Sequence, residues 1–590
     1  MTKRTMDRQR GVGMMQRYLI LASTFVLGVN SAVAAVGSRP PARSWPAFPV
    51  PSKIYQVRWP KAFDKQIALE TLAGLAAYHA RITGAGPMIW INSDQASEQH
   101  WFKMYHRRYP VPISTDWPSL VKQMQKQGIL KGYVLYSSAS PTTAGKHPKA
   151  GDFSVNLATS LCAPLGAVAL DDSLAVKAQK QSLPKLADTR GKDMAWLLAQ
   201  LHGRFSKRLL GLLLPQQPNQ RDELVAANAL VVSDNPAGGY RQGLLRMHPG
   251  GIVVGWGGNE LDLTSLASKY ALRVCAADWV RNLPVLSSGV TGLKYPLAKR
   301  AIPAAAINDD GHSHYVAFIN SDGDNLAWAL GGFTTDSDVW GNPARGKIPF
   351  GWSTPLQVLL QVCPCTVDYL RSSATAQDDF TPYWTGYFYL DEFGRLRGGL
   401  KPFDGILRRQ RLFMRKLKLH TMMAFCANKW NSHAALRGYR HIAAMLPKLN
   451  AVFVVQYDPY AAGRGKIIWL PRKPGGPLPV LSALASIWNM PSNKYAGSPK
   501  HVAKLLNRWA ARPVKQPQDR FTWVVVHAWS RFKSPKVGGK PQQLFAAAQA
   551  CIGRLGRGIK VVTPEALAIL LNKTHGPVAP SDHRLSHVKR

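Results

Sequence analysis

Acidic side chains are scarce in this chain. Its 590 residues include 33 Asp and Glu against 75 Lys and Arg, which gives a formal net charge of +42 at pH 7. A surplus of this size indicates anionic surroundings or partners, such as nucleic acid, a phospholipid surface or an acidic polysaccharide. The basic residues are spread along the whole chain, which favours a generally basic surface over a dedicated nucleic-acid arm. Since carboxylates are few, each local cluster of them is informative.

Cysteine is also rare, and several common motifs are absent. The six cysteines are spaced too irregularly to predict a pairing, and Cys363-Pro364-Cys365 has no second pair with which to bind zinc. An oxidising compartment would allow disulfides, but we expect most of the six to be buried free thiols. The chain has no Walker-type phosphate loop, no tandem zinc-ligand pairs and no Gly-x-Ser-x-Gly elbow, which excludes sites of those kinds.

Long apolar runs are missing after the first 30 residues. At the N-terminus, five basic residues precede a short apolar stretch at 18–29, and Ala32-Val33-Ala34 follows with small side chains. This order predicts a signal peptide over residues 1–34, with an uncleaved anchor as the alternative, because the apolar stretch is short for a membrane span. We therefore expect a periplasmic or secreted protein with no membrane span after cleavage.

Alternating apolar runs and helical patterns predict an α/β protein with several domains. We expect a Pro-rich lead-in at 35–52, three small N-terminal α/β domains, a C-terminal (β/α) barrel-like domain and a basic, disordered tail at 575–590. The three small domains are predicted at 53–127, 128–215 and 216–303, and the barrel-like domain at 304–574. Within them, residues 194–214 show one long amphipathic pattern, and 224–232 are predicted to form a strand.

Four apolar strands of the last domain end in polar side chains. The strand at 315–319 is followed by Asp322, Asp324 and Asn325, and the strand at 421–425 by Asn428. Gln456 and Asp458 follow the strand at 451–455, and His527 and Trp529 follow the one at 522–526. Strands that feed helices in this way place their active sites at the carboxyl ends of the strands. We therefore expect these side chains to meet.

The sequence Ser321-Asp322-Gly323-Asp324-Asn325 is the centre of the predicted site. Either aspartate could act as acid or nucleophile in glycosidic cleavage, which requires two carboxyl groups across the scissile bond. The same oxygens could instead hold Ca²⁺ or Mg²⁺, with His527 if the metal is softer. A purely structural turn with a helix N-cap at Asp324 or Asn325 is the third interpretation. No other cofactor is predicted.

Aromatic residues stand beside a second pair of carboxylates. Tyr387 and Tyr389 directly precede Asp391 and Glu392, which suits a sugar subsite, because ring faces pack on sugars while acids take the hydroxyls. The alternative is a strand with core tyrosines and a solvated acidic turn. His527 could be an acid–base group or a histidine satisfied by backbone carbonyls.

A predicted helix at 406–419 is strongly basic. Its cations could grip an acidic glycan or a phosphate backbone, although a solvated basic face over an apolar stripe is the commoner explanation. They are Arg408, Arg409, Arg411, Arg415, Lys416 and Lys418.

Several motifs together resemble those of the family named "GxGYxYP putative glycoside hydrolases", which are secreted bacterial proteins. The segment 384–390 lies where the signature would fall and keeps Gly386, Tyr387 and Tyr389, but Trp384 replaces the first Gly and Leu390 the final Pro. The turn at 321–325, Asp379-Phe380, Gly255-Trp256 with Glu260, and Asp278 with Asn282-Leu283 are also similar to family segments. Covering residues 50 to 575, the resemblance implies small N-terminal α/β domains, a C-terminal barrel-like domain and a sugar-processing role.

These observations support a secreted glycoside hydrolase acting on a polysaccharide, which could be acidic. The predicted catalytic residues are Asp322, Asp324, Asp391, Glu392, Asp458 and His527. The predicted substrate-binding residues are Asn325, Tyr387, Tyr389, Asn428, Gln456 and Trp529. A metal-dependent, deacetylase-like enzyme and a non-catalytic binder of anionic envelope glycan are the rival hypotheses. A nucleic-acid partner is disfavoured by the predicted export and by the lack of a recognised module.

Overall fold

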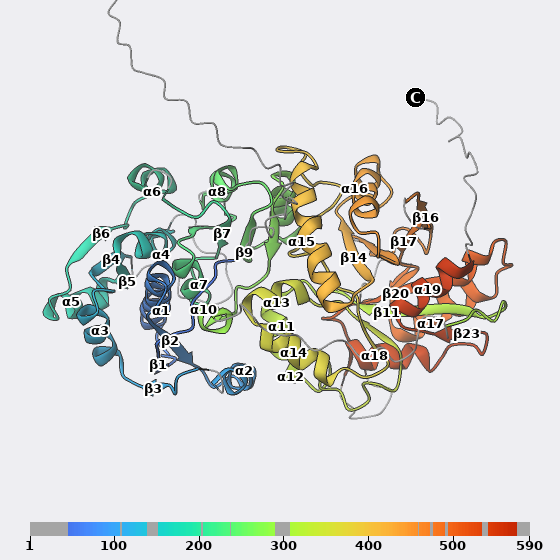
Figure 1. Cartoon of the computed structure of the whole chain (residues 1–590), viewed down its shortest axis with the longest axis horizontal. Helices are drawn as coiled ribbons and strands as arrows, with labels where there is room; N and C mark the ends of the chain where they lie inside the picture. The colour runs from blue at the N-terminus through green and yellow to red at the C-terminus, as the bar shows by residue number, and fades with distance from the viewer. Residues whose placement is uncertain are drawn as a thin grey trace, which may run out of the picture. The chain divides into compact units, whose positions relative to one another are not determined.

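The structure is a computed structural model of the chain. It describes residues 45–106, 109–137, 152–201, 204–235, 238–288, 307–457, 460–472, 476–489, 494–533 and 541–574. The predicted signal peptide and the predicted tail at 575–590 lie outside these ranges, as does Asp458. The described residues belong to one compact unit, which Figure 1 colours along the chain.

Three small parallel sheets form the N-terminal half of this unit, drawn blue to green in Figure 1. Their strands are β1 (Lys53–Arg58), β2 (Pro87–Asn92), β3 (Ile113–Ser114), β4 (Gly132–Tyr136), β5 (Ala167–Asp171), β6 (Lys185–Asp188), β7 (Leu209–Leu212), β8 (Leu230–Val232), β9 (Ile252–Gly255) and β10 (Arg273–Cys275). The strand orders are β2-β1-β3, β5-β4-β6 and β10-β9-β7-β8. The helices are α1 (Phe63–Thr83), α2 (Ala96–His106), α3 (Trp117–Lys126), α4 (Ser154–Leu165), α5 (Asp172–Lys180), α6 (Met194–Leu201), α7 (Arg221–Ala226), α8 (Tyr240–Arg246), α9 (Glu260–Lys269) and α10 (Leu283–Ser287).

Helix α1 is buried on all sides over its middle turns. Every residue from Ile67 to Ala77 is buried, so the helix lies within the core of this half rather than on its surface. At Gly74 the backbone of α7 comes so close that an added Cβ would lie 2.5 Å from the carbonyl oxygen of Asp222. Glycine is therefore required where the two helices touch.

Two predicted elements of this half were wrong. The pattern at 194–214 predicted one amphipathic segment, but the structure has α6 followed by β7. The residues of β7, Leu-Leu-Gly-Leu, are all buried between β8 and β9, and a strand covered on both faces shows no alternation to tell it from a helix. The predicted strand at 224–232 is instead the end of α7 followed by the shorter β8, with Asn228 at φ 53° in the turn between them.

The C-terminal half contains two larger sheets and a two-stranded ribbon. Its strands are β11 (His314–Asn320), β12 (Phe350–Trp352), β13 (Asp378–Phe380), β14 (Thr421–Cys426), β15 (Ala451–Gln456), β16 (Ile467–Leu470), β17 (Leu478–Ser482), β18 (Ala485–Ile487), β19 (Ala496–Gly497), β20 (Phe521–Val526), β21 (Arg531–Phe532), β22 (Gln542–Gln543) and β23 (Ile559–Val561). The helices are α11 (Leu326–Leu330), α12 (Gly332–Thr335), α13 (Leu356–Val362), α14 (Pro364–Ser373), α15 (Lys401–Leu417), α16 (His433–Met445), α17 (Pro499–Ala510), the 3₁₀ helix η2 (Pro517–Arg520), α18 (Leu544–Ile552) and α19 (Pro564–Thr574).

The strands of this half do not close into one hydrogen-bonded barrel in the described ranges. One sheet has the order β13-β12-β11-β20-β18-β19, with β23 also paired to β11, and the other has the order β14-β15-β17-β16. Backbone hydrogen bonds connect the two sheets at points such as Met423 N to Pro382 O (3.0 Å) and Leu484 N to Trp523 O (2.9 Å). The mostly parallel α/β architecture is confirmed, whereas the barrel stays a prediction.

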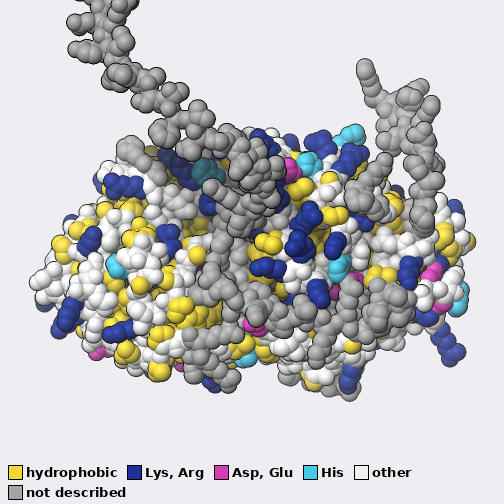
Figure 2. All heavy atoms as spheres, in the orientation of Figure 1, with side chains coloured by type: hydrophobic (Ala, Val, Ile, Leu, Met, Phe, Trp, Pro, Cys, Tyr) yellow, Lys and Arg dark blue, Asp and Glu magenta, His cyan; other side chains and the backbone are white. Residues whose placement is uncertain are grey.

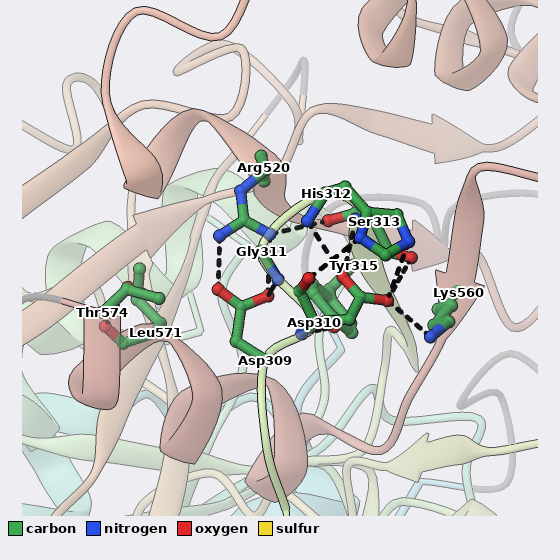
Figure 3. Close-up of polar contacts among 10 residues, drawn as sticks. All are labelled: Asp309, Asp310, Gly311, His312, Ser313, Tyr315, Arg520, Lys560, Leu571 and Thr574. Carbon is green, nitrogen blue, oxygen red and sulfur yellow. Dashed lines mark hydrogen bonds and ion pairs between the residues drawn. The ribbon is translucent and has the colours of Figure 1, made fainter.

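Strands β11 and β20 run in parallel and in register, from Tyr315 opposite Phe521 to Asn320 opposite Val526. Their carboxyl ends therefore lie side by side, and the turns that carry Asp322 and His527 leave the sheet at the same edge. At the other edge, Arg520 binds Asp309 through both of its terminal nitrogens and Lys560 binds Asp310, as Figure 3 shows. These contacts connect β11, β20 and β23 where the strands begin.

The six cysteines are all free and buried, and the Sγ atoms of Cys363 and Cys365 lie 3.5 Å apart. In the described part of the chain, no helix is both long and apolar enough to cross a membrane.

Candidate active site

The turn after β11 presents Asp322. Asn320 ties the end of β11 to the segment after β12, because its side chain accepts a hydrogen bond from Ser353 N (2.8 Å) and donates one to Ser353 O (3.3 Å). Asp322 then takes a left-handed backbone conformation with φ 60°, which aspartate tolerates better than most residues. Gly323 packs against Ser353 so tightly that an added Cβ would lie 1.9 Å from its carbonyl oxygen. The turn is thus held rigidly.

Asn325 has a structural contact. Its side chain accepts a hydrogen bond from Trp328 N (2.8 Å) and so caps α11, as the structural alternative predicted for this position. The ionisable groups of the turn are therefore its two aspartates, Asp322 and Asp324, while Asn325 holds the helix.

A second carboxylate reaches the same place from the N-terminal half. Strand β9 ends at Gly255, where φ is +119° and an added Cβ would lie 2.0 Å from Leu212 O. Asn259 caps α9 by accepting a hydrogen bond from Asp262 N (3.2 Å), and Glu260 is the first residue of that helix. Glu260 is therefore held at the carboxyl end of a parallel strand, as Asp322 is.

The segment around Gly386 joins the two halves of the molecule. Tyr387 pairs with Val274 through hydrogen bonds in both directions, of 2.6 and 2.7 Å, and Tyr389 pairs with Phe425 of β14. Gly386 has φ +141°, and an added Cβ would lie 3.0 Å from the Cβ of Arg273, so a side chain there would be strained. In this arrangement the Tyr387 hydroxyl donates a hydrogen bond to Glu260 Oε1 (3.0 Å) and lies 3.3 Å from the Tyr389 hydroxyl.

Two carboxyl groups of this site have a raised pKa. Burial first, and then the negative charge of Asp322, raise the pKa of Glu260 to about 7, while the hydrogen bond from Tyr387 opposes the rise. Burial, with the charges of Asp322 and Glu260, raises the pKa of Asp324 well above its usual value. Within the described residues, no Lys or Arg is among the groups that shift either pKa. We call Glu260, Asp322 and Asp324 the acidic cluster.

Tyr383, Tyr387 and Tyr460 surround the acidic cluster. Burial is the largest cause that raises the pKa of all three hydroxyls, and the nearby carboxylates add to it. The rings of Tyr383 and Tyr387 pack edge to face at 6.5 Å. The carboxylates thus lie in an aromatic surrounding.

His527 is a further ionisable side chain near Asp322. Its ring stacks on Trp488 with centroids 4.6 Å apart, and Nδ1 lies 2.9 Å from Ser530 Oγ. Burial lowers the pKa of His527, and the charge of Asp322 opposes that shift. Tyr460 packs on Trp488 at 4.5 Å, so the two rings continue the aromatic wall.

Asp391 and Glu392 make other contacts. The Asp391 carboxylate accepts hydrogen bonds from the backbone of Ala427 (2.8 Å) and Asn428 (2.9 Å), which shapes the turn after β14. Glu392 accepts two bonds of 2.8 Å from Arg395 and one of 2.7 Å from the Asn428 side chain. Asp391 and Glu392 are thus bound by the turn after β14 and by Arg395, and they do not belong to the acidic cluster.

Among the other predicted residues, Gln456 accepts a hydrogen bond from Trp430 N (3.3 Å). Trp529 is 46% exposed and packs on Trp328 with centroids 4.9 Å apart. The described ranges contain no group of three or more His, Cys, Asp or Glu side chains that could hold a metal ion. The cation at Asp322 and Asp324 stays a prediction.

Three models of one protein family match successive parts of the chain. Residues 130–205 match the "GxGYxYP_N second domain", 215–288 the "GxGYxYP third domain", and 312–572 the "GxGYxYP putative glycoside hydrolase C-terminal domain". The chain belongs to the GxGYxYP family.

A solved structure shows the same fold as this GxGYxYP protein. It is the crystal structure of a "putative hydrolase" from Bacteroides thetaiotaomicron VPI-5482, with 22% sequence identity and a TM-score of 0.72. The match covers 90% of the present chain and 97% of the other. No curated protein matches the chain.

The signature of the GxGYxYP family is incomplete in this chain, but its central Gly386 and Tyr387 are kept, and Tyr387 contacts the acidic cluster. Gly386 allows the close approach to Arg273, and Tyr387 binds Glu260. Leu390, which replaces the final Pro, is buried and packs so closely on Gly438 of α16 that an added Cβ there would lie 2.5 Å from its side chain. The departures thus fall at packing positions.

Glu260 was not among the predicted site residues. Its sequence signals were its place directly after a buried strand and its similarity to a family segment, both of which mark the position but not its partner. The pairing of Val274 with Tyr387, the hydrogen bond from Tyr389 N to Ser268 Oγ of α9 (3.0 Å) and the one from Ala327 N to Ala276 O (3.0 Å) bring α9 to the turn after β11. Conversely, Asp391 and Glu392 follow aromatic residues in sequence but are bound by neighbouring groups in space.

Proposed function

We propose that this GxGYxYP protein is a glycoside hydrolase in which Glu260 and Asp322 are the two catalytic carboxyl groups. The observation that carries the proposal is the pKa of Glu260, which is raised to about 7 beside the charge of Asp322. Glycosidic cleavage needs one protonated and one ionised carboxyl group at the same bond. The raised pKa of Glu260 favours its protonated form, and Asp322 is the neighbouring carboxyl group.

Each group then has a role. Glu260, protonated near neutral pH, donates its proton to the leaving oxygen, and the Tyr387 hydroxyl positions its carboxyl group. Asp322, held by its rigid turn, is the second carboxyl group, which attacks the sugar or activates a water. Burial favours the protonated form of Asp324. His527, whose ring stacks on Trp488, is a further ionisable side chain near Asp322.

The sugar at this site should be uncharged. Tyr460 and Trp488 give the site an aromatic surrounding, and the ionisable neighbours of Glu260 and Asp324 are acids and tyrosines. A carboxylate or sulfate on the reacting sugar would add negative charge beside these acids. We therefore favour a neutral glycosyl unit over an acidic one at the cleavage point.

The proposal can be tested by measuring new reducing ends released from neutral and acidic polysaccharides. We expect the wild-type protein to act on a neutral polymer, and both Asp322→Asn and Glu260→Gln to lose that activity. Asp262→Asn is the matched control, because Asp262 is an exposed residue on the same helix as Glu260, and it should keep full activity. Full activity in Asp322→Asn, or no release by wild type from any polymer, would contradict the proposal.

A further inference from the structure

A basic hollow lies away from the candidate active site, beside the end of α15. Its volume is about 610 Å³, which is within the range of ligand-binding pockets. Five of its lining residues are basic or can become so, and none is acidic: Arg411, Arg415, Lys418, His420 and Lys448. We call these five residues the basic groove. Its floor is aliphatic and includes Leu446 and Leu449.

The cations of the basic groove lack counterions in the described part of the chain. Arg411, Arg415, Lys418 and Lys448 are exposed, and none of them forms an ion pair with a described residue. His420 alone is paired, with Glu565 at 2.8 Å. Cations at the end of a helix stabilise its dipole, which accounts for Arg415 and Lys418. Lys448 belongs to the loop after α16, so the dipole of α15 does not explain its place.

The basic groove continues into a second hollow. That hollow has a volume of about 350 Å³, shares Lys418 and His420 with the groove, and includes Arg371 in its wall. Arg371 is buried and donates a hydrogen bond to Leu417 O (2.9 Å). Asp378, Asp379 and Glu565 also line this second hollow, so the surplus of cations belongs to the basic groove. Figure 2 shows Lys and Arg side chains gathered over the part of the surface where Figure 1 draws α15.

We infer that the basic groove binds a segment of anionic polysaccharide through its carboxylate, phosphate or sulfate groups. Uncompensated cations around an aliphatic floor fit a sugar chain, whose rings have apolar faces between charged substituents. Single-stranded nucleic acid fits less well, because its binding uses aromatic side chains for stacking. His420 is the one aromatic ring in the described lining of the groove.

The position of the groove separates it from catalysis. His420 directly precedes β14 and Lys448 lies shortly before β15, so the groove is at the amino ends of these strands, opposite to the edge that carries Asp322. The groove would therefore hold the protein on an anionic polymer while the acidic cluster meets a neutral sugar. This inference does not depend on the proposed hydrolase activity.

Binding of the chain from Ala35 onward to immobilised polygalacturonate and dextran sulfate, with neutral dextran as blank, tests the inference. Replacing Arg411, Arg415 and Lys448 together by Ala should weaken binding roughly tenfold or more at moderate salt and reduce its salt dependence. The matched control replaces Lys500, Lys504 and Arg508 of α17, which are three exposed cations elsewhere, by Ala and should change binding less than about threefold.

Two results would overturn the inference. Equal weakening by both triple variants would mean that the overall positive charge, not the groove, binds the polymer. Tighter binding of a single-stranded oligonucleotide than of either polysaccharide at matched charge would assign the groove to nucleic acid. Hydrolysis of a neutral polymer, where the wild type shows it, should be unchanged in the groove variant, so that failure of the catalytic proposal remains distinguishable.

Discussion

Strand β11 has aspartates before it and after it, and the two groups are held in different ways. Before the strand, Arg520 binds Asp309 and Lys560 binds Asp310, as Figure 3 shows, and these hydrogen-bonded cations lower the pKa of both carboxyl groups. Beyond the end of the strand, burial and neighbouring carboxylates raise the pKa of Asp324 and of Glu260, which reaches this place from α9. Carboxyl groups thus stabilise the fold at the start of β11, whereas those near its end lower the stability of the folded protein.

The pH dependence of stability should differ in sign between the two ends. Asp309 has a lowered pKa in the folded state, so its contribution is present above its unfolded value of 3.8 and is lost as the pH falls through the folded value. Glu260 has a raised pKa, so the folded protein retains a proton that the unfolded chain releases between 4.5 and about 7. Its effect is to lower stability as the pH rises through that window. A cluster of acids that lowers the stability of the folded protein in this way is typical of a functional site.

The largest effect is expected from neutralising the acidic cluster. Asp322→Asn should lower the rate of polysaccharide cleavage by roughly 10²–10⁴-fold, because it removes one of the two proposed catalytic carboxyl groups. Its free energy of unfolding should not fall, since the substitution also removes repulsion of Glu260 and Asp324. Initial rates and urea unfolding of the same preparation measure both. Destabilisation by several kcal/mol would mean that Asp322 belongs to the structural group of aspartates.

Removing a cation at the other end of β11 should act on stability instead. Arg520 has 6% and Asp309 15% of its side chain exposed, so Arg520→Ala leaves a largely buried carboxylate without its partner. We expect the free energy of unfolding to fall by about 3 kcal/mol or more. The rate per folded molecule should remain close to that of the wild type. A specific loss of activity with normal stability would undermine the distinction between the two ends.

The Tyr387 hydroxyl should set the alkaline limit of activity. Its hydrogen bond lowers the pKa of Glu260, so Tyr387→Phe raises that pKa and moves the fall in activity to higher pH, by up to about one unit. The pH profile of kcat/KM measures this limit. Tyr389→Phe is the control, because Tyr389 forms no hydrogen bond to Glu260 in the described structure. A shift toward lower pH in Tyr387→Phe would contradict the assignment of Glu260 as proton donor.

The smallest effect is expected from Lys560, whose side chain is 54% exposed. Lys560→Ala should lower the free energy of unfolding far less than Arg520→Ala does, because an exposed ion pair gains little over solvated charges. Added salt should reduce the difference further. Thermal unfolding at low and high salt checks this expectation. A loss as large as that of Arg520→Ala would show that the network of Figure 3 acts as a unit.

Local patterns were sufficient for most elements of the fold. The apolar runs at β11, β14, β15 and β20 were predicted close to their observed bounds. Prediction was wrong at 194–214, where the short strand β7 is covered on both faces and its apolar run has no period of its own. The closed barrel stays unconfirmed because strand closure depends on pairings between residues far apart in the chain, which periodicity does not report.

From the amino-acid order alone follow the basic charge, the α/β units and the acidic turn of Asp322, Gly323 and Asp324. These features depend on composition or on residues a few positions apart. Only the tertiary structure brings Glu260 to Asp322, across 62 positions, through the pairing of the Tyr387 segment with β10. It also assigns Asp391 and Glu392 to neighbouring amides and Arg395. Burial and neighbouring charge set the protonation of a carboxyl group, and both are properties of the folded chain.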